Sequence, residues 1–344
     1  MTNSIKEVIK IKLKDVSFYD LKSLVKKIDW VPIAEILKRN KDPRGKKTTF
    51  KPVNCFLAFI LGAYLEIEDD TELARRIAQH KEYQEFCGVR QAPSHDVLTD
   101  FRNDYEHLLE KVFFYFDNLL EFFGAFKGDG LSCDGTDIPV PIKNKQSPHR
   151  YHFGAKSDKK KFHGFWLMAA TSIKHQIARS FLVGYAREGQ IEVCKDMLKL
   201  RRIDDSEDNF YFFFDGIFDC QEIYKLTLEQ QGKLPIIGYN KRGSSYETLE
   251  DLPEDDWRFL YNPLLHFPDY IYKIYKQRDA SERFNGHSKT YTLISKVANK
   301  VKKQHTILKS NVEHIATFTF ILEQLKLLTE YKDKLRQATL SDFY

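Results

Sequence analysis

The stretch 275–289 combines a phenol, two cations and a carboxylate at helical spacing. If it is helical, Tyr275, Arg278, Glu282 and Lys289 lie at i, i+3, i+7 and i+14. At about 100° per residue these positions share an arc of roughly 60° on one helix face. An acid among cations suits a site where the carboxylate holds a divalent ion while arginine and lysine bind phosphates. A solvated face with i,i+4 ion pairs is the alternative.

Two further acids follow apolar segments that we predict to be strands. Asp134 lies in the segment 130–140, and Asp215 directly follows the aromatic run 209–214. A short, fully apolar run of this kind is typical of a central strand buried on both faces. Each acid is therefore placed where a strand could present it at the edge of a sheet.

Each of these acids has a rival nearby. Asp137 is an alternative to Asp134, and Asp219 is an alternative to Asp215. We favour Asp134 because it follows an apolar stretch and precedes a predicted turn. We favour Asp215 because Asp219 and Glu222 have the D-x-x-E spacing of a capping box that opens the next helix.

The elements around these acids alternate between strands and helices. Periodicity predicts strands at 130–140, 165–173, 178–183, 209–214 and 234–239, and helices at 190–200 and 219–231. A small irregular insertion at 240–270 precedes the helix that carries Glu282. This order indicates an α/β, ribonuclease-H-like mixed five-stranded sheet with flanking helices. In that layout the first and fourth strands are neighbours, so Asp134 and Asp215 should converge, with Glu282 across them.

Three converging carboxylates without histidine or cysteine suit hard divalent ions. Mg²⁺ or Mn²⁺ prefers carboxylate and water ligands. Two such ions about 4 Å apart support displacement at a phosphodiester. Without ions, three carboxylates this close raise one another's pKa, so we expect the site to work metal-loaded.

Two lysine-rich segments flank the predicted acids. Residues 143–161, which end in Lys159, Lys160 and Lys161, interleave basic and aromatic side chains, and residues 289–309 contain several lysines and no acid. Such segments suit phosphate contacts, which give affinity with little sequence information. Taken alone, a lysine-rich loop is more often simply solvated.

Residues 1–125 form an all-helical N-terminal domain in our prediction. Ser94 is a candidate N-cap for a helix that carries Arg102, after predicted helices at 52–65 and 70–80. Two short helices before a capped third resemble a helix-turn-helix bundle that could present Arg102 to DNA. A purely structural bundle explains this segment equally well.

Composition sets broad limits on the 344-residue chain. The net charge is only +5, so DNA binding must depend on where basic residues cluster. Five scattered cysteines predict free thiols in a reducing compartment. The first residues lack a signal-peptide pattern, and the longest apolar runs, of about ten residues, are too short to span a bilayer. We expect a cytoplasmic, nucleoid-associated protein with domains at 1–125 and 126–330 and a tail at 331–344.

The signature Tyr-x2-Arg-x3-Glu-x6-Lys at 275–289 resembles that of a group of DDE transposases from bacterial insertion sequences. Asp134-Gly135-Thr136 resembles the family's first acidic motif, and Asp215 follows an apolar strand as the family's second acid does. The segment 48–105 looks like the helical end-binding domain that precedes the catalytic domain in these enzymes. The resemblance covers roughly residues 45–330.

The resemblance implies specific roles for these residues. Asp134, Asp215 and Glu282 would bind two Mg²⁺ or Mn²⁺ ions, and Tyr275, Arg278 and Lys289 would contact phosphates near the cut. The partners would be double-stranded DNA, at terminal inverted repeats and at the target, with a homodimer on DNA and no membrane. A catalytically inactive transposase-derived DNA-binding protein and a purely hydrolytic ribonuclease-H-like nuclease are the competing interpretations.

Overall fold

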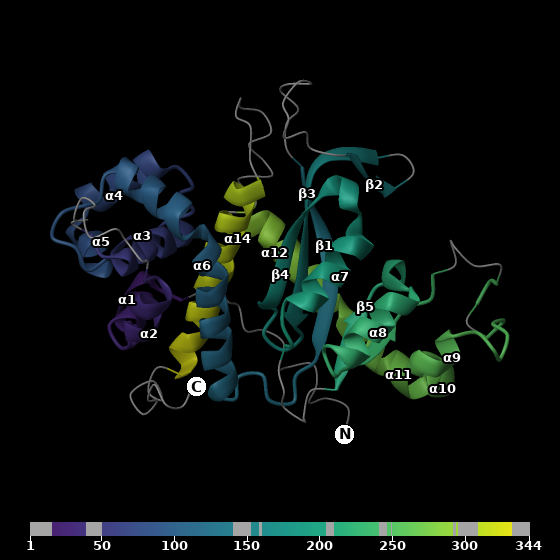
Figure 1. Cartoon of the computed structure of the whole chain (residues 1–344). Coiled ribbons are helices and arrows are strands. Elements are labelled where there is room, and N and C mark those ends of the chain that lie inside the picture. The colour runs from purple at the N-terminus through teal and green to yellow at the C-terminus, as the bar shows by residue number, and fades with distance from the viewer. Residues whose placement is uncertain are drawn as a thin grey trace. The chain divides into compact units, whose positions relative to one another are not determined.

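The chain folds into two compact units (Figure 1). The computed structural model describes residues 16–38, 50–139, 153–157, 160–203, 210–240, 246–248, 250–291, 294 and 309–331, without the side chains of 153–163 and 287–291. The first unit comprises the described residues within Met1–Ala125, Thr292–Ile294 and Ser310–Tyr344. The second comprises those within Phe126–Tyr291 and Ser295–Lys309.

The second unit contains a mixed sheet with the strand order β2-β3-β1-β5-β6, in which β4 also pairs with β3. The strands are β1 (Leu131–Pro139), β2 (Phe153–Ser157), β3 (Lys160–Ser172), β4 (Ala178–Tyr185), β5 (Tyr211–Phe214) and β6 (Leu234–Ile237). All five predicted strands are present. The additional strand, β2, falls within the segment that we had treated as a lysine-rich loop.

The register of β1 brings the first two predicted acids together. β1 runs antiparallel to β3 and parallel to β5, with Cys133 opposite Phe214. Asp134 directly follows Cys133, and Asp215 directly follows Phe214. The two acids therefore occupy neighbouring positions. The first and fourth predicted strands therefore lie side by side, as expected.

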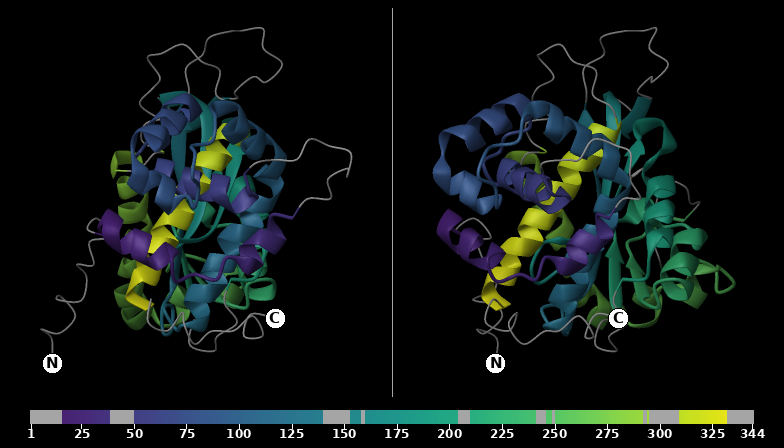
Figure 2. Two further views of the ribbon diagram at one scale, coloured as in Figure 1. Left: turned by 90° about the vertical axis from the view of Figure 1, so that its left-hand side faces the viewer. Right: turned by 60° about the vertical axis from the view of Figure 1, so that its left-hand side comes forward.

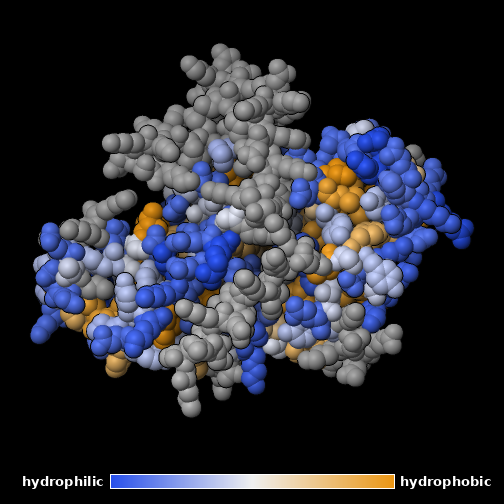
Figure 3. All heavy atoms as spheres, turned by 180° about the vertical axis from the view of Figure 1, so that it is seen from behind, coloured by the Kyte–Doolittle hydropathy of each residue, from blue (hydrophilic) through white to orange (hydrophobic). Residues whose placement is uncertain are grey.

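Apolar residues cover both faces of this sheet. On one face, side chains such as Met168, Phe212 and Phe214 form a core with α7 (Gln190–Leu200) and α8 (Gln221–Glu229). On the other face, Phe213 and Ile236 pack against α10 (Pro263–His266) and α11 (Pro268–Tyr275). The short helix α9 (Arg258–Tyr261) precedes α10. In the view of Figure 3, the coloured surface is mostly hydrophilic, with apolar side chains in scattered patches.

Two local expectations were wrong. β1 continues through Asp134 without the turn that we predicted after it. The N-cap of α8 is Cys220, without a side-chain hydrogen bond, so Asp219 and Glu222 form no capping box. Asp219 is instead engaged with Arg258, a partner distant in sequence that the local spacing could not reveal.

The stretch 275–289 is helical, but not as one regular helix. α11 ends at Tyr275, a 3-10 turn spans Lys276–Arg278 (η5), and α12 covers Asp279–Tyr291. α12 passes through Asn285 and Gly286 without a break. The helical path is therefore irregular just before α12, in the turn that contains Arg278.

In the first unit, the described residues before Phe126 contain helices and no strand. The helices are α1 (Phe18–Val25), α2 (Val31–Ile36), α3 (Pro52–Tyr64), α4 (Asp70–Gln79), α5 (Lys81–Phe86) and α6 (His95–Phe122). Ser94 caps α6 as predicted, its hydroxyl accepting from the backbone N–H of Val97. α14 (Lys309–Leu328), yellow in Figure 2, belongs to the same unit, and its Phe318 ring lies 5.4 Å from that of Phe56. A 3-10 turn (η7, Thr329–Tyr331) follows α14.

Candidate active site

The three predicted acids lie on three elements of the second unit that pack together. Asp134 is in β1, Asp215 follows β5 and caps the 3-10 turn η3 (Gly216–Phe218), and Glu282 is in the first turn of α12. α12 packs against β1 and β3. The arrangement places two acids on neighbouring strands and the third on the helix that covers them.

Arg278 lies between two of these carboxylates. Its Nη1 is 3.5 Å from Asp215 Oδ1, and its Nη2 is 2.9 Å from Glu282 Oε1. Both acids are about half exposed, at 50% and 55%, whereas the arginine side chain is only 19% exposed. Burial lowers the pKa of Arg278, but the Tyr275 phenol and the three carboxylates, Asp134 included, outweigh it and raise that pKa. Arg278 is therefore a permanent cation that contacts Asp215 and Glu282 and also interacts with the charge of Asp134.

Asp134 is held by two hydrogen bonds at a partly buried position. Its Oδ1 accepts from the Gly135 backbone N–H at 2.8 Å, and its Oδ2 accepts from Asn285 Nδ2 at 2.9 Å. Burial raises the pKa of Asp134 to about 6, with a further contribution from the negative charge of Asp215. The two hydrogen bonds and Arg278 act in the opposite direction. A further cation beside this carboxylate would lower its pKa.

The backbone of Arg278 is anchored to β1. The hydroxyls of Ser132 and Ser281 each lie 2.9 Å from the Arg278 carbonyl oxygen and 2.9 Å from each other. Both serines are buried. The η5 turn is consequently fixed to the strand that carries Asp134, while the guanidinium extends from it.

Tyr275 fixes the other side of the turn. Its hydroxyl donates to the Phe214 carbonyl oxygen at 3.0 Å, directly before Asp215. A Cβ at Gly238 would collide with the Tyr275 hydroxyl, so glycine is required for this close approach. Burial raises the pKa of Tyr275 to about 12. In this state Tyr275 orients the helix relative to β5, and its predicted phosphate contact stays a prediction.

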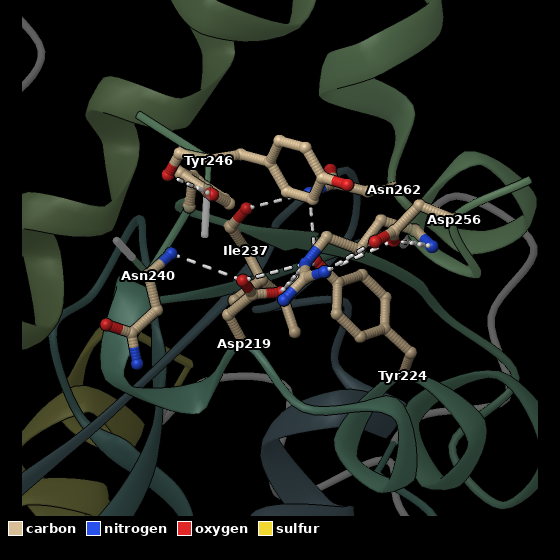
Figure 4. A network of polar contacts seen from close by, with 9 residues as sticks. Asp219, Tyr224, Ile237, Asn240, Tyr246, Asp256 and Asn262 are labelled. Carbon is tan, nitrogen blue, oxygen red and sulfur yellow. Dashed lines mark hydrogen bonds and ion pairs between the residues drawn. The ribbon is translucent and has the colours of Figure 1, made fainter. Parts of the chain in front are cut away.

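The rival acids occupy different environments. Asp137 is three residues from Asp134 on the same strand, so its side chain points to the opposite face of the sheet. Asp219 is fully buried, and its two oxygens accept from Arg258 Nε at 3.1 and 3.0 Å (Figure 4). It also accepts from the Asn240 backbone N–H at 3.2 Å and from the Tyr224 hydroxyl at 3.3 Å. These contacts saturate Asp219 and favour a structural role.

The other predicted DNA-binding residues are distributed over both units. The backbones of Lys160 and Lys161 belong to β3 and that of Lys289 to α12, but their side chains, and all of Lys159, lie outside the described residues. In the first unit, Arg102 Nη2 pairs with Asp70, which also accepts from the Thr99 hydroxyl at 3.0 Å. Burial lowers the pKa of Arg102. Arg102 is thus engaged within its own unit, and its role in DNA binding is still a prediction.

The donors at this site have the chemistry that a divalent ion requires, but they are not gathered around one point. Carboxylate oxygens are the preferred ligands of Mg²⁺ and Mn²⁺. Within the described part of the chain, no three acidic, histidine or cysteine side chains are grouped closely enough to hold a metal together. Asp215 and Glu282 are instead joined through the guanidinium of Arg278.

Sequence reasoning missed three residues of this site. Asn285, Ser132 and Ser281 hold Asp134 and the η5 turn, yet none of them belongs to a recognised signature. Asn285 follows Glu282 by three residues and therefore shares its helix face, which is the one signal that could have identified it. The two serines carry no comparable signal because they meet across 149 residues of sequence.

Comparison with known proteins gives one result, in the N-terminal part of the chain. Residues 10–104 match the family described as "Transposase domain (DUF772)". No curated protein and no solved structure gives a significant match. Among the described helices, none is long and apolar enough to cross a membrane. The family match covers less than a third of the chain, precedes all three acids, and supports a relation to transposases for those residues.

Proposed function

We propose that this chain is a DDE transposase that cuts DNA at the ends of its own element and joins the freed 3′ hydroxyl to target DNA. The observation that carries the proposal is the placement of Asp134, Asp215 and Glu282 on β1, β5 and α12 around one arginine. The strand order and the parallel β1–β5 pair support a ribonuclease-H-like fold for the second unit. The family match at residues 10–104 is independent support for the transposase function, because the matched segment does not contain any of the three acids.

The three acids would hold two Mg²⁺ or Mn²⁺ ions. When bound, such ions activate a water or a 3′ hydroxyl and stabilise the leaving oxygen. Asn285 keeps the Asp134 carboxylate oriented toward the site through its hydrogen bond to Oδ2. Tyr275 and the serine pair hold Arg278 and the start of α12 against the two strands. These contacts would hold Asp134 and the start of α12 in place, and Asp215 and Glu282 would have to turn from Arg278 toward the ions.

The DNA partner would be held by cations around these acids. Arg278 presents a planar guanidinium that matches a phosphate in a bidentate manner. Lys289 and the Lys159–Lys161 segment would contribute further phosphate contacts, as the family resemblance implies. Two element ends must be brought together for transposition, so we propose a homodimer on DNA.

The test is cleavage of a labelled duplex that carries the native flanking end, in Mg²⁺ and in EDTA. We expect wild type to nick at the end, and we expect Asp134→Asn, Asp215→Asn, Glu282→Gln and EDTA each to stop it. Asp137→Asn is the matched control, because this acid is on the same strand but the opposite face. Cleavage that persists in all three variants would refute the proposed site.

The same substrate separates the competing functions. Binding of the duplex without cleavage in Mg²⁺ or Mn²⁺ would identify a DNA-binding protein without activity. Cleavage without joining of an exposed 3′ end to a second duplex would identify a hydrolytic nuclease. A joined product is expected for a transposase.

A further inference from the structure

Arg278 lies between Asp215 and Glu282, two of the acids that we propose as metal ligands. We propose that Arg278 is an exchangeable internal counter-ion: it pairs with these acids in the metal-free protein and is displaced to a DNA phosphate when a divalent ion binds. This inference rests on the proposed function, and it adds a coupling between metal binding and DNA binding at the same site.

The pairing geometry supports exchange of the side chain. The guanidinium uses one nitrogen for each acid, at 3.5 Å and 2.9 Å, rather than forming a bidentate pair with either. Both carboxylates are half exposed and can be reached from solvent. Because water reaches both carboxylates, neither ion pair excludes solvent, and another cation can approach the acids from the exposed side.

The backbone at Arg278 permits this exchange without rearrangement of the site. The Arg278 carbonyl oxygen is held by the Ser132 and Ser281 hydroxyls, so the main chain stays attached to β1. The guanidinium carbon lies 5.8 Å from the centre of the Tyr275 ring, which offers an apolar wall along which the side chain can turn. Only side-chain torsions of Arg278 need to change.

Charge makes the two cations mutually exclusive at this point. Asp134, Asp215 and Glu282 all interact with the Arg278 charge. A divalent ion between the same carboxylates would repel the guanidinium at contact distance. Once released, the arginine can pair with a phosphate, and by thermodynamic linkage metal and DNA must then strengthen each other's binding equally.

Mn²⁺ binding to the full-length protein without DNA tests the competition, with free Mn²⁺ followed by electron paramagnetic resonance. We expect Arg278→Ala to bind Mn²⁺ at least about ten-fold more tightly than wild type, because its competitor is gone. Lys276→Ala is the matched control: it removes the same charge from the η5 turn, but its ammonium lies 5.9 Å from the Tyr272 ring centre rather than against an acid. Equal or weaker Mn²⁺ binding by Arg278→Ala than by Lys276→Ala would overturn the inference.

A second measurement uses wild type, so it does not depend on how a variant folds. Affinity for the duplex end, followed by fluorescence anisotropy, should rise about ten-fold when Ca²⁺ is added as a non-catalytic ion. Affinity that is unchanged by Ca²⁺ would overturn the coupling while leaving the proposed function intact. Failure of wild type to bind Mn²⁺ even with DNA would refute the proposed function as well.

Discussion

Asp215 and Asp219 follow the same strand, four residues apart, and each faces an arginine, yet their environments differ in every other respect. Asp219 is fully buried and accepts hydrogen bonds from Arg258, Asn240 and Tyr224. Asp215 is half exposed and shares Arg278 with a second acid. The first arrangement is saturated, whereas the second leaves oxygen atoms available to a ligand.

The difference teaches which feature separates a structural acid from a functional one. Burial raises the pKa of Asp219, and its partners, Arg258 among them, oppose that effect without reversing it. The network also joins Asn262 to Tyr224 and to the Ile237 carbonyl, so it ties α10 to the end of β6. An acid that holds three elements together is needed for stability. An acid whose oxygen atoms are exposed to solvent, such as Asp215, can still bind a ligand.

The strongest test of this comparison is activity. Asp215→Asn should reduce end cleavage by at least about 1,000-fold, because the variant loses a carboxylate that we propose as a metal ligand. Its fold should be unaffected. Single-turnover cleavage in Mg²⁺, together with circular dichroism, measures both, and substantial activity in this variant would show that Asp215 is not the second acid.

Stability should show the reverse order. Asp219→Ala removes the buried acceptor shared by Arg258, Tyr224 and Asn240 and leaves Arg258 paired with Asp256 alone among the described residues, which costs about 3 kcal/mol. Asp215→Ala removes a half-exposed partner, which costs at most about 1 kcal/mol. Urea denaturation monitored by intrinsic fluorescence gives the free energy of unfolding of both variants. Equal decreases would show that Asp219 is no more important for stability than Asp215.

The raised pKa of Asp134 predicts that ionisation of this buried carboxyl lowers the free energy of unfolding. Burial raises that pKa from 3.8 to about 6, so the folded state binds this proton more tightly than the unfolded state. The resulting stability is fully present below about pH 4 and is lost as pH rises through 6, a change of about 3 kcal/mol. In EDTA, Asp134→Asn should therefore gain stability relative to wild type between pH 4 and 7. A difference that is independent of pH would contradict the raised pKa.

The smallest effect concerns Asn285. Replacing it with alanine removes the donor to Asp134 Oδ2 and should weaken cleavage by about 10–100-fold, as expected for residues that orient metal ligands. Gly286→Ala is the matched control, since nothing lies within 4 Å of the added Cβ. We expect this control to retain activity. Equal activity of the two variants would show that Asn285 only packs.

Much of the fold could be predicted because it depends on local pattern. The Ser94 cap, the apolar helix α3 and the aromatic strand before Asp215 were all evident from neighbouring residues. β2 was missed because Phe153–Ser157 lies among lysines that favour a solvated loop. The η5 turn was missed because the Ser132 hydroxyl, 146 residues away in sequence, helps to hold the chain there.

The sequence by itself determined the strand order and the helical spacing that set Arg278 and Glu282 on one face. Only the tertiary structure decided which acid after β5 is buried, because Asp219 is satisfied by Arg258 from 39 residues away. It likewise placed Asn285 against Asp134, and Arg278 between Asp215 and Glu282. The physical reason is that periodicity and capping depend on near neighbours, whereas the burial and pairing of a charge depend on whichever distant segments the fold brings to it.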